Sequence, residues 1–572
     1  VYSTEIAWVG RGDSKCLTPE KTEEGMGEDD YQNDFNRAYR TKKNSPRNKM
    51  LNTAPLKDTA EPILKYKVVQ NEMGAFGYIR LESFVPEKLT TDEVILEVKK
   101  ILLKDFAKTD GLIFDLRNNG GGYIYLAEAL VQLFTPKNTL PLNFRLKNSH
   151  ANRHFMYQSP TNIWAMALKE AEATAAPFTV NMPLNPATEL DVVGQYYFKP
   201  VALLTNANCY SSCDMFSALM QDHDAAIIFG EDSTTGAGGA NNRSHNDTIL
   251  SLKEDLGPYK KLPSGQDMGF SFRQTIRTGQ SEGVFLEDRG VVSDRIVPAS
   301  LSDLYTDSGD QYKVIAKALI ERSNQHTSWV KINEDRLDLL VTDEPKMLIK
   351  WMQTDKIEFK VNRRSMEQIA VELDNTIGQS FPFPKLETTN KYEAGEVEIV
   401  GAKEGKRVWR KIQAYRLVPQ TIMLEDDLLI SLESATSHPF AVYNYKNLTD
   451  DGWIVQDGTL KTGNSEEYVD SVKTEASLFL QLSETKDFSL NFDAQVNSEK
   501  DFDYLRVKLT VEGKDVDLIK GLSGDEEMKT YNFDLSAYKG KKVEIRFIFE
   551  SDKGVTDKGV VLKNLSVTSK AL

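Results

Sequence analysis

The sequence has few cysteines and no long apolar run. Only 3 of its 572 residues are Cys, so at most one internal disulfide can form and one thiol is left over. No stretch approaches the roughly 18 consecutive apolar residues that a membrane-spanning helix needs. The longest apolar runs, such as Ala225–Phe229, are typical of buried strands. These two absences exclude a disulfide-rich scaffold and a helical membrane protein.

Basic residues are also in short supply. Lys and Arg number 70 and Asp and Glu 85, which gives a formal net charge of −15. Phosphate contacts need clustered Lys and Arg, so we expect no nucleic-acid partner. The Cys and His residues do not show the close paired spacing of a zinc site, and we expect no metal and no cofactor. Asp501 and Asp503 could bind calcium, but we interpret them as solvated surface carboxylates.

The length and the patterning predict several domains. Residues 1–62 are polar and poorly patterned, and we interpret them as an N-terminal segment or the remnant of a preceding domain. Strands alternate with helices over 63–325, which predicts β-α-β units and a parallel sheet. Residues 136–196 interrupt this alternation and are predicted to be an inserted cap. Short strands at near-regular spacing predict two β-sandwich domains over 326–440 and 441–572. The expected fold class is therefore multidomain α/β plus all-β.

A glycine-rich loop follows one predicted strand of this sheet. The loop Asp115–Gly122 comes after the apolar strand Leu112–Leu116 and before a predicted helix, Ile124–Phe134. Its three successive glycines allow a tight turn and leave backbone N–H groups uncovered. Such groups at a helix N-terminus can hold an anion or an oxyanion. The alternative is a plain strand-to-helix turn without a ligand.

A serine-bearing loop follows a later strand. The loop Thr205–Asp214 lies between the predicted strand Pro200–Thr205 and the predicted helix Ser212–Gln221. A serine at such an elbow presents its hydroxyl at the positive end of a helix, as a nucleophile requires. The alternative is an ordinary N-cap serine, for which Ser is a preferred residue.

Taken together, these motifs resemble those of the tail-specific, or C-terminal processing, serine peptidases. Residues 115–122 match that family's Asp-Leu-Arg-x-Asn-x-Gly-Gly loop in full, and the resemblance covers residues from about 70 to 322. The further matches, in chain order, are Asn206, Ser211–Asp214, Met220–Asp222, Gly230–Ser233, Gly283–Asp294 and Asp303-Leu304.

The resemblance implies a spiral ββα peptidase core of the crotonase or ClpP type. It also implies that Ser211 is the nucleophile and that Gly121 and the N–H of Ser212 form the oxyanion hole. Asp222 corresponds to an Asp at a helix end near the site. The expected reaction is serine endopeptidase cleavage of extended or unfolded protein substrates. No PDZ domain, which usually grips substrate C-termini in this family, is recognisable in the sequence.

One departure from the family concerns the general base. Many members use a Ser/Lys dyad whose Lys would fall near Gly236 here, but the sequence has no Lys at that place. A branch that resembles the tricorn core protease uses Ser, His and Glu instead, and its Glu corresponds to Glu287. The candidates for the base are His245, His150, His154 or a residue upstream of Val1. His223 is more simply a helix-end residue.

Cys209 and Cys213 flank Ser211. They could form a small disulfide that fixes the elbow, or a redox switch. We favour the alternative of two small buried thiols, because free Cys is often buried.

The last block resembles the jelly-roll domains, related to MAM modules, that follow secreted bacterial proteases. Tyr538–Phe547 and Lys558–Leu565 carry this resemblance. It implies adhesion, substrate capture or packing against the core. Because the first residue is Val1 and not Met, we expect the sequence to start after a removed segment or at an artificially chosen boundary. The expected location is secreted, periplasmic or on a bacterial cell surface.

The sequence therefore favours a serine peptidase whose partner is a protein or peptide substrate. The main alternative is a catalytically inactive, peptidase-like scaffold for peptide or surface binding. A carbohydrate-binding surface protein is a third hypothesis, which depends only on residues 441–572. The oligomeric state is not predicted.

Overall fold

We describe a computed structural model of the chain. It covers residues 56–569 apart from these stretches: 158–161, 191–192, 247–248, 250–259, 263–265, 301, 305–308, 326–327, 333–335, 341–345, 362–363, 384–393, 419, 434–437, 445–451, 463–466, 469–471 and 552–555. In this described part of the chain, no helix has both the length and the apolar character that crossing a bilayer requires.

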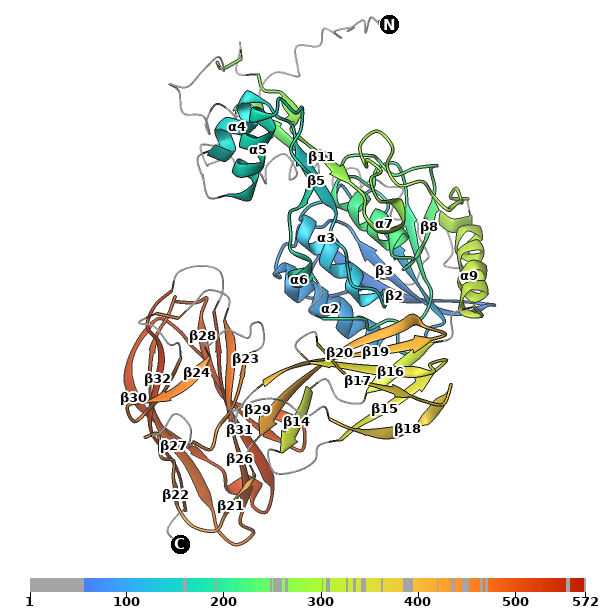
Figure 1. The fold of residues 1–572 in the computed structure, drawn as a ribbon. Coiled ribbons are helices and arrows are strands. Elements are labelled where there is room, and N and C mark those ends of the chain that lie inside the picture. Colours follow the sequence, from blue (N-terminus) through green and yellow to red (C-terminus); the bar gives the residue numbers. More distant parts are fainter. Residues whose placement is uncertain are drawn as a thin grey trace, which may run out of the picture.

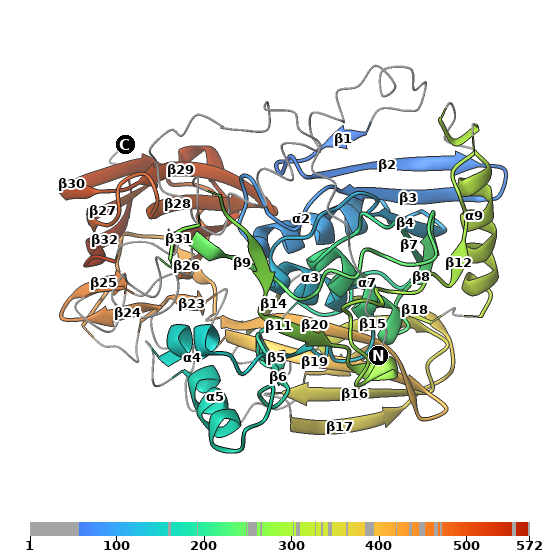
Figure 2. The same ribbon diagram turned by 90° about the horizontal axis from the view of Figure 1, so that it is seen from above.

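A seven-stranded sheet organises the N-terminal part of the structure (Figures 1 and 2). Its strands, in spatial order, are β1 (Lys57–Asp58), β2 (Leu64–Asn71), β3 (Gly74–Leu81), β4 (Gly111–Asp115), β7 (Val201–Thr205), β8 (Ile227–Gly230) and β12 (Arg295–Ile296). From β3 to β12 all neighbours pair in parallel. The carboxyl ends of β4 and β7 therefore lie side by side at one edge of the sheet.

Helices cover both faces of this sheet (Figure 1). On one face lie α2 (Thr91–Lys104), α3 (Ile124–Leu130) and α7 (Ser212–Asp222), which share an apolar core with Leu112 and Phe114 of β4. On the other face α9 (Asp310–Ser323) packs against Ile113. Successive residues of β4 thus point into different cores, as the side chains of a buried strand must.

A two-helix cap stands away from the sheet at the end of an arm (Figure 1). The arm pairs β5 (Asn143–Leu146) with β11 (Arg273–Ile276) in antiparallel fashion, and β6 (Met182–Pro183) joins β5. The cap helices are α4 (His150–Tyr157) and α5 (Ile163–Ala173). Because β11 lies far from β5 in sequence, the cap is anchored by two distant parts of the chain.

The next block contains a three-stranded and a five-stranded sheet around a shared apolar core that includes Trp351 and Trp409. Their strands are β13 (Trp329–Ile332), β14 (Arg336–Leu340), β15 (Lys346–Met352), β16 (Lys356–Val361), β17 (Arg364–Ala370), β18 (Asn375–Pro382), β19 (Ala394–Lys403) and β20 (Lys406–Val418). This block touches the first one where the Arg410 N–H donates to Gln195 Oε1 at 3.2 Å and Lys411 lies over the Tyr196 ring.

Two six-stranded sheets form the C-terminal block around a second large core. Their strands are β21 (Ile422–Leu424), β22 (Leu428–Leu429), β23 (Ala441–Asn444), β24 (Trp453–Gln456), β25 (Thr459–Thr462), β26 (Lys473–Leu482), β27 (Phe488–Asn497), β28 (Tyr504–Val511), β29 (Lys514–Leu522), β30 (Asp525–Asp534), β31 (Lys542–Glu550) and β32 (Gly559–Ser569). The strands β21 and β22 pair with β26 and β32. The structure thus places the start of this block near residue 422, and the sequence interpretation placed it at 441.

A buried arginine joins the two β blocks. Arg416 of β20 donates to Asp338 at 2.7 Å, to Glu475 at 2.8 Å and to Glu544 at 2.6 Å. The Arg416 side chain has no exposed area. The last two carboxylates belong to the C-terminal block, so this one guanidinium spans the boundary between the blocks.

Candidate active site

The glycine-rich loop and the serine-bearing loop lie against each other. Both leave the sheet at neighbouring strands, the first after β4 and the second after β7. The Tyr210 N–H donates to the Asn119 carbonyl at 3.0 Å, and the Asn118 N–H donates to Asn206 Oδ1 at 2.9 Å. Two turns that are about ninety residues apart in sequence therefore form one surface.

Gly121 lies close to the serine-bearing loop. A β-carbon placed on Gly121 would lie 2.6 Å from Ser211 Cβ and 2.8 Å from the Ser212 nitrogen. Gly121 also has a φ of +100°, which favours glycine. Both its conformation and its surroundings therefore exclude a side chain at this position, and the backbone of the loop reaches the serine directly.

Ser211 has an unusual backbone conformation. It precedes α7 with φ 55° and ψ −120°, outside the regions that L-residues commonly adopt. Its side chain does not cap the helix, and the Ser211 hydroxyl forms no hydrogen bond with any described residue. An ordinary N-cap serine has extended backbone and uses its hydroxyl for the helix. The N-cap alternative thus does not describe Ser211.

Ser212 is the first residue of α7 and is fully buried. Its hydroxyl donates to the Gly122 carbonyl at 2.6 Å, which fastens the helix start to the glycine-rich loop. Its N–H belongs to the first helical turn, where no carbonyl within the helix is available to it. This amide is accordingly a donor at the positive end of α7.

The amide of Gly121 is already engaged. It donates to Asn119 Oδ1 at 2.9 Å, while the Asn119 side-chain amide donates to the Leu81 carbonyl at 3.1 Å. The N–H of Gly122, the next residue, has no acceptor among the described residues. An oxyanion donor from this loop is therefore more readily supplied by Gly122 in this conformation, and Gly121 would first have to release Asn119.

A third loop, Thr234–Ala240, packs against the serine elbow through Asp214. The buried Asp214 carboxylate accepts the N–H of Ala237 at 3.0 Å and that of Gly238 at 2.9 Å. Burial raises the pKa of Asp214 to about 6, although its hydrogen bonds oppose this shift. Asp214 thus fixes the third loop one helical turn after Ser211.

This raised pKa predicts a pH dependence of stability. Asp214 has a higher pKa in the folded protein than its ordinary 3.8. Its favourable contribution to the free energy of unfolding is therefore complete below about pH 4 and is lost as the pH rises through about 6. We expect wild type to lose about 3 kcal/mol of unfolding free energy relative to Asp214→Asn over that interval. Denaturant unfolding of both proteins between pH 4 and 7 measures this, and parallel pH profiles would contradict it.

The Tyr210 ring fills the place of the expected Lys. A β-carbon on Gly236 would lie 2.0 Å from Tyr210 Cδ2, and one on Gly238 would lie 1.9 Å from Tyr210 Cε1. The Gly236 N–H also donates to the Cys209 carbonyl at 2.8 Å. Any side chain at 236 would therefore displace Tyr210. The absence of a Lys near Gly236 is therefore consistent with the position of the Tyr210 ring, which occupies the space that such a side chain would need.

Overpacking at this contact gives a second prediction. We expect Gly238→Ala to lower the free energy of unfolding by about 1–3 kcal/mol, because its methyl group overlaps the Tyr210 ring. The same substitution in a Tyr210→Ala background should cost less, which a double-mutant cycle detects. Gly269→Ala is the matched control, since nothing lies within 4 Å of its added carbon. Equal costs in both backgrounds would show that the tyrosine does not occupy this space.

Glu287 lies under the far end of the third loop. Its Oε1 accepts the Thr275 N–H at 2.7 Å, and a β-carbon on Gly239 would lie 3.0 Å from the same oxygen. Its Oε2 is buried and has no hydrogen-bond partner among the described residues. Burial raises the pKa of Glu287. The structure does not bring Glu287 into hydrogen-bonding contact with Ser211.

The histidines in the described part of the chain do not supply a base to Ser211 in this conformation. His223 Nε2 accepts the Leu140 N–H at 3.1 Å, and its Nδ1 lies 2.9 Å from the Leu219 carbonyl, so this ring has a structural role.

The three candidate histidines are engaged elsewhere. His150 and His154 stack on one another in the cap helix α4. His245 Nε2 lies 2.7 Å from the Lys260 carbonyl. None of the described histidines hydrogen-bonds to Ser211.

Asp222 forms a buried ion pair. Its carboxylate accepts from Arg277 Nε at 2.8 Å and from Arg277 Nη2 at 2.7 Å. This bidentate contact ties the end of α7 to the segment after β11. The position of Asp222 therefore supports the helix that carries Ser211, and the residue does not touch the serine.

A charge network lies behind the glycine-rich loop. Arg117 donates to Asp115 at 2.7 Å and to Glu231 at 2.6 Å, and Arg80 donates to Asp115 at 2.9 Å. Burial alone would raise the pKa of Asp115, but the two guanidinium groups outweigh it and hold that pKa well below its ordinary value. These contacts fix the loop after β4 relative to the loop after β8.

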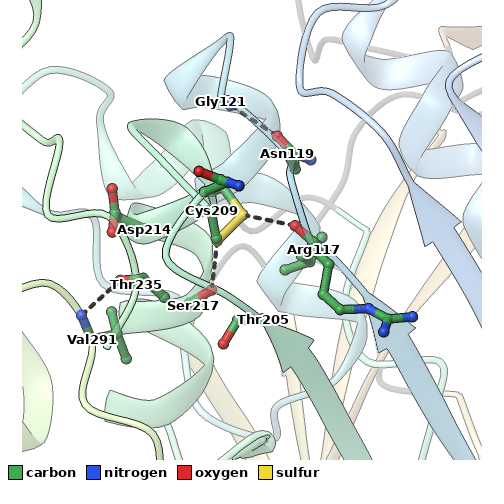
Figure 3. Close-up of a disulfide and its surroundings, with 12 residues drawn as sticks. Arg117, Asn119, Gly121, Thr205, Cys209, Asp214, Ser217, Thr235 and Val291 are labelled. Atoms are coloured by element: carbon green, nitrogen blue, oxygen red, sulfur yellow. Dashed lines mark hydrogen bonds between the residues drawn. A yellow bond between two sulfur atoms is a disulfide. The ribbon is translucent and has the colours of Figure 1, made fainter. Parts of the chain in front are cut away.

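Cys209 and Cys213 are joined by a disulfide, so the expectation of two separate thiols is wrong (Figure 3). Their Cα atoms are 5.2 Å apart, within the range a bridge requires. The first turn of α7 and the sharp elbow before it bring the two residues together. The spacing of four allowed this bridge, but only the three-dimensional path of the elbow shows it.

No group of three or more potential metal ligands occurs among the described residues. Asp503, one of the two carboxylates considered for calcium, is buried and accepts a hydrogen bond from the Tyr468 hydroxyl. It is therefore not the solvated surface carboxylate that the sequence suggested.

Both loops lie within a region that matches a known family model. Residues 75–268 match the model of peptidase family S41. No curated protein matches the chain.

Several solved structures share local likeness with the chain. Mature CPAF in complex with lactacystin is 16% identical, with a TM-score of 0.33 over 48% of this chain and 57% of that one. A putative peptidase from Parabacteroides merdae is 18% identical, with a TM-score of 0.31 over 48% and 68%. The photosystem II D1 C-terminal processing protease is 14% identical, with a TM-score of 0.26 over 41% and 48%. The matched region spans little more than half of the first of these proteins.

Proposed function

We propose that Ser211 is the nucleophile of a serine endopeptidase, in a chain whose residues 75–268 match the model of peptidase family S41. The observation that carries this proposal is the strained Ser211 elbow, which lies against a glycine-rich loop at the N-terminus of α7. Strained backbone of this kind persists where the surrounding structure enforces it, often at active sites.

In this mechanism the Ser211 oxygen attacks the carbonyl carbon of a peptide bond. The negative charge that develops on the carbonyl oxygen is stabilised by the Ser212 N–H and by an amide of the glycine-rich loop, either Gly122 or Gly121 after it releases Asn119. The amine then leaves, and water hydrolyses the ester on Ser211. Each donor is a backbone group, so its position depends on how the two loops pack.

The serine proton must pass to a base, since a serine without one is a weak nucleophile near neutral pH. Glu287, with a buried oxygen that has no described partner, is proposed to orient this base, as in the Ser/His/Glu arrangement of the tricorn-like branch. The base itself would approach Ser211 when substrate binds. His245, His150, His154 and a residue upstream of Val1 stay open as candidates.

We propose extended or unfolded protein chains as substrates. The third loop connects the site to β11 through Thr275, and β11 runs into the arm that carries the cap. A peptide bound along such strands would be extended, since strand edges hold peptides by main-chain hydrogen bonds.

A catalytically inactive scaffold is the second candidate. Two observations favour it: the Ser211 hydroxyl has no partner among the described residues, and the Gly121 amide is occupied. Such a protein would still bind peptide across the two loops.

We further propose a secreted, periplasmic or cell-surface location, with the jelly-roll-like C-terminal block serving adhesion or substrate capture. The Cys209–Cys213 bridge supports export, because disulfides persist mainly in oxidising compartments.

Covalent labelling with a fluorophosphonate tests the proposed function. We expect the label on Ser211 alone, identified by peptide mass spectrometry, and no label on Ser211→Ala. A correctly folded wild type that takes up no label and cleaves no unfolded protein would favour the inactive scaffold.

A further inference from the structure

We propose that the Cys209–Cys213 disulfide positions Ser211, so that the reactivity of the Ser211 hydroxyl depends on the oxidation state of this cysteine pair. The inference rests on the proposed serine chemistry and adds redox regulation of the same site.

The bridge encloses the strained residue. Ser211 stands midway between the two cysteines, with φ 55° and ψ −120°. Such a conformation is energetically unfavourable for a non-glycine residue. Its neighbours must therefore hold it, and a covalent link from two residues before to two residues after limits the backbone most directly.

The bridge is also fixed at both ends (Figure 3). Cys209 Sγ lies 3.7 Å from the Ser217 hydroxyl, and Cys213 Sγ lies 3.7 Å from the Leu116 carbonyl oxygen. The Cys209 carbonyl accepts the Gly236 N–H at 2.8 Å. One covalent unit thus contacts α7, the start of the glycine-rich loop and the third loop.

Reduction would undo this arrangement. A dithiol donates two electrons and two protons to the pair, the Sγ–Sγ bond becomes two thiols, and the dithiol becomes a cyclic disulfide. Two thiols need more room than two bonded sulfurs, and neither cysteine has any exposed area. A close-packed interior accommodates extra volume by shifting backbone. Ser211 would relax towards ordinary N-cap geometry, and its hydroxyl would leave the glycine-rich loop.

Thiol counting tests whether the disulfide is present, and labelling tests whether its reduction lowers the reactivity of Ser211. In denatured, unreduced protein we expect one reactive thiol, Cys16, and three after dithiothreitol. The rate of fluorophosphonate labelling at Ser211 should fall about 100-fold on reduction, the cost of a displacement of about 1 Å. It should recover on reoxidation, with the same midpoint in a dithiothreitol redox series as the thiol count. Three thiols before reduction, or an unchanged labelling rate, would overturn the proposal.

Cysteine variants separate the bridge from general effects of the reductant. The double variant Cys209→Ser/Cys213→Ser should label slowly and respond to no reductant, whereas Cys16→Ser should behave as wild type. Circular dichroism verifies that the double variant folds. A folded double variant that labels as fast as oxidised wild type would rule out a positioning role.

Hydrogen exchange keeps this inference distinct from the proposed function. Amides of residues 206–217 should exchange faster after reduction whether or not Ser211 is reactive. Faster exchange without labelling in either state would refute the serine chemistry but would still show that the disulfide holds this segment in place. Unchanged exchange would refute the positioning role of the disulfide.

Discussion

Ser211→Ala is expected to lower kcat for hydrolysis of an unfolded protein substrate by about 10⁴-fold or more, while leaving KM nearly unchanged. Removal of a serine nucleophile has effects of this size because the covalent path disappears and only transition-state binding remains. The β-carbon of Ser211, which contacts the glycine-rich loop, is retained in alanine. Initial rates with a fluorescent casein measure the loss.

Ser281→Ala is the matched control for this experiment. Ser281 lies in the short helix Gly279–Ser281, and its hydroxyl forms no hydrogen bond within the described residues. We expect its kinetics and its thermal unfolding to match wild type. Equal turnover by Ser211→Ala and Ser281→Ala would remove Ser211 from the mechanism.

Arg416→Ala is expected to destabilise the protein by about 3–5 kcal/mol. Removing one partner of a buried ion pair leaves uncompensated charge in the interior, and Glu475 has no exposed side-chain area. Glu475 also pairs with Arg546, whose Nη2 lies 2.6 Å from Glu475 Oε2, and this second ion pair offsets part of the cost. The loss should appear in unfolding of the β blocks, because Arg416 spans their boundary.

Arg506→Ala is the comparison for this substitution. Arg506 pairs with Glu550 at 3.0 Å, but both side chains are partly exposed, and such pairs contribute about 1 kcal/mol or less. Differential scanning calorimetry of the two variants gives both values. If Arg416→Ala were no more costly than Arg506→Ala, the buried network would not hold the blocks together.

Local pattern predicted the elements around the site well. The expected strand Leu112–Leu116 is observed as Gly111–Asp115, and the expected helix Ser212–Gln221 as Ser212–Asp222. Apolar strands and strand-to-helix turns are defined by neighbours in sequence, so they can be predicted from it. The motifs from Asp115 to Ser233 lie within residues 75–268, which match the model of peptidase family S41.

Features that depend on distant contacts could not be predicted in this way. The short strands β21 and β22 pair with residues far along the chain, and nothing local marks them as part of the C-terminal block. The place of the Tyr210 ring depends on how a third loop packs over the elbow. The Asn119 contact to Gly121 is an exception, because an Asn side chain often bonds the backbone two residues on.

The middle β block contacts the chain just before the strand that leads to the serine. Arg410 and Lys411 meet Gln195 and Tyr196, and β7 begins a few residues later. A fragment ending near residue 325 would expose this interface and remove the contacts that hold the segment before β7. We therefore expect residues 75–268 not to fold stably on their own, and truncated variants should retain the chain through β20.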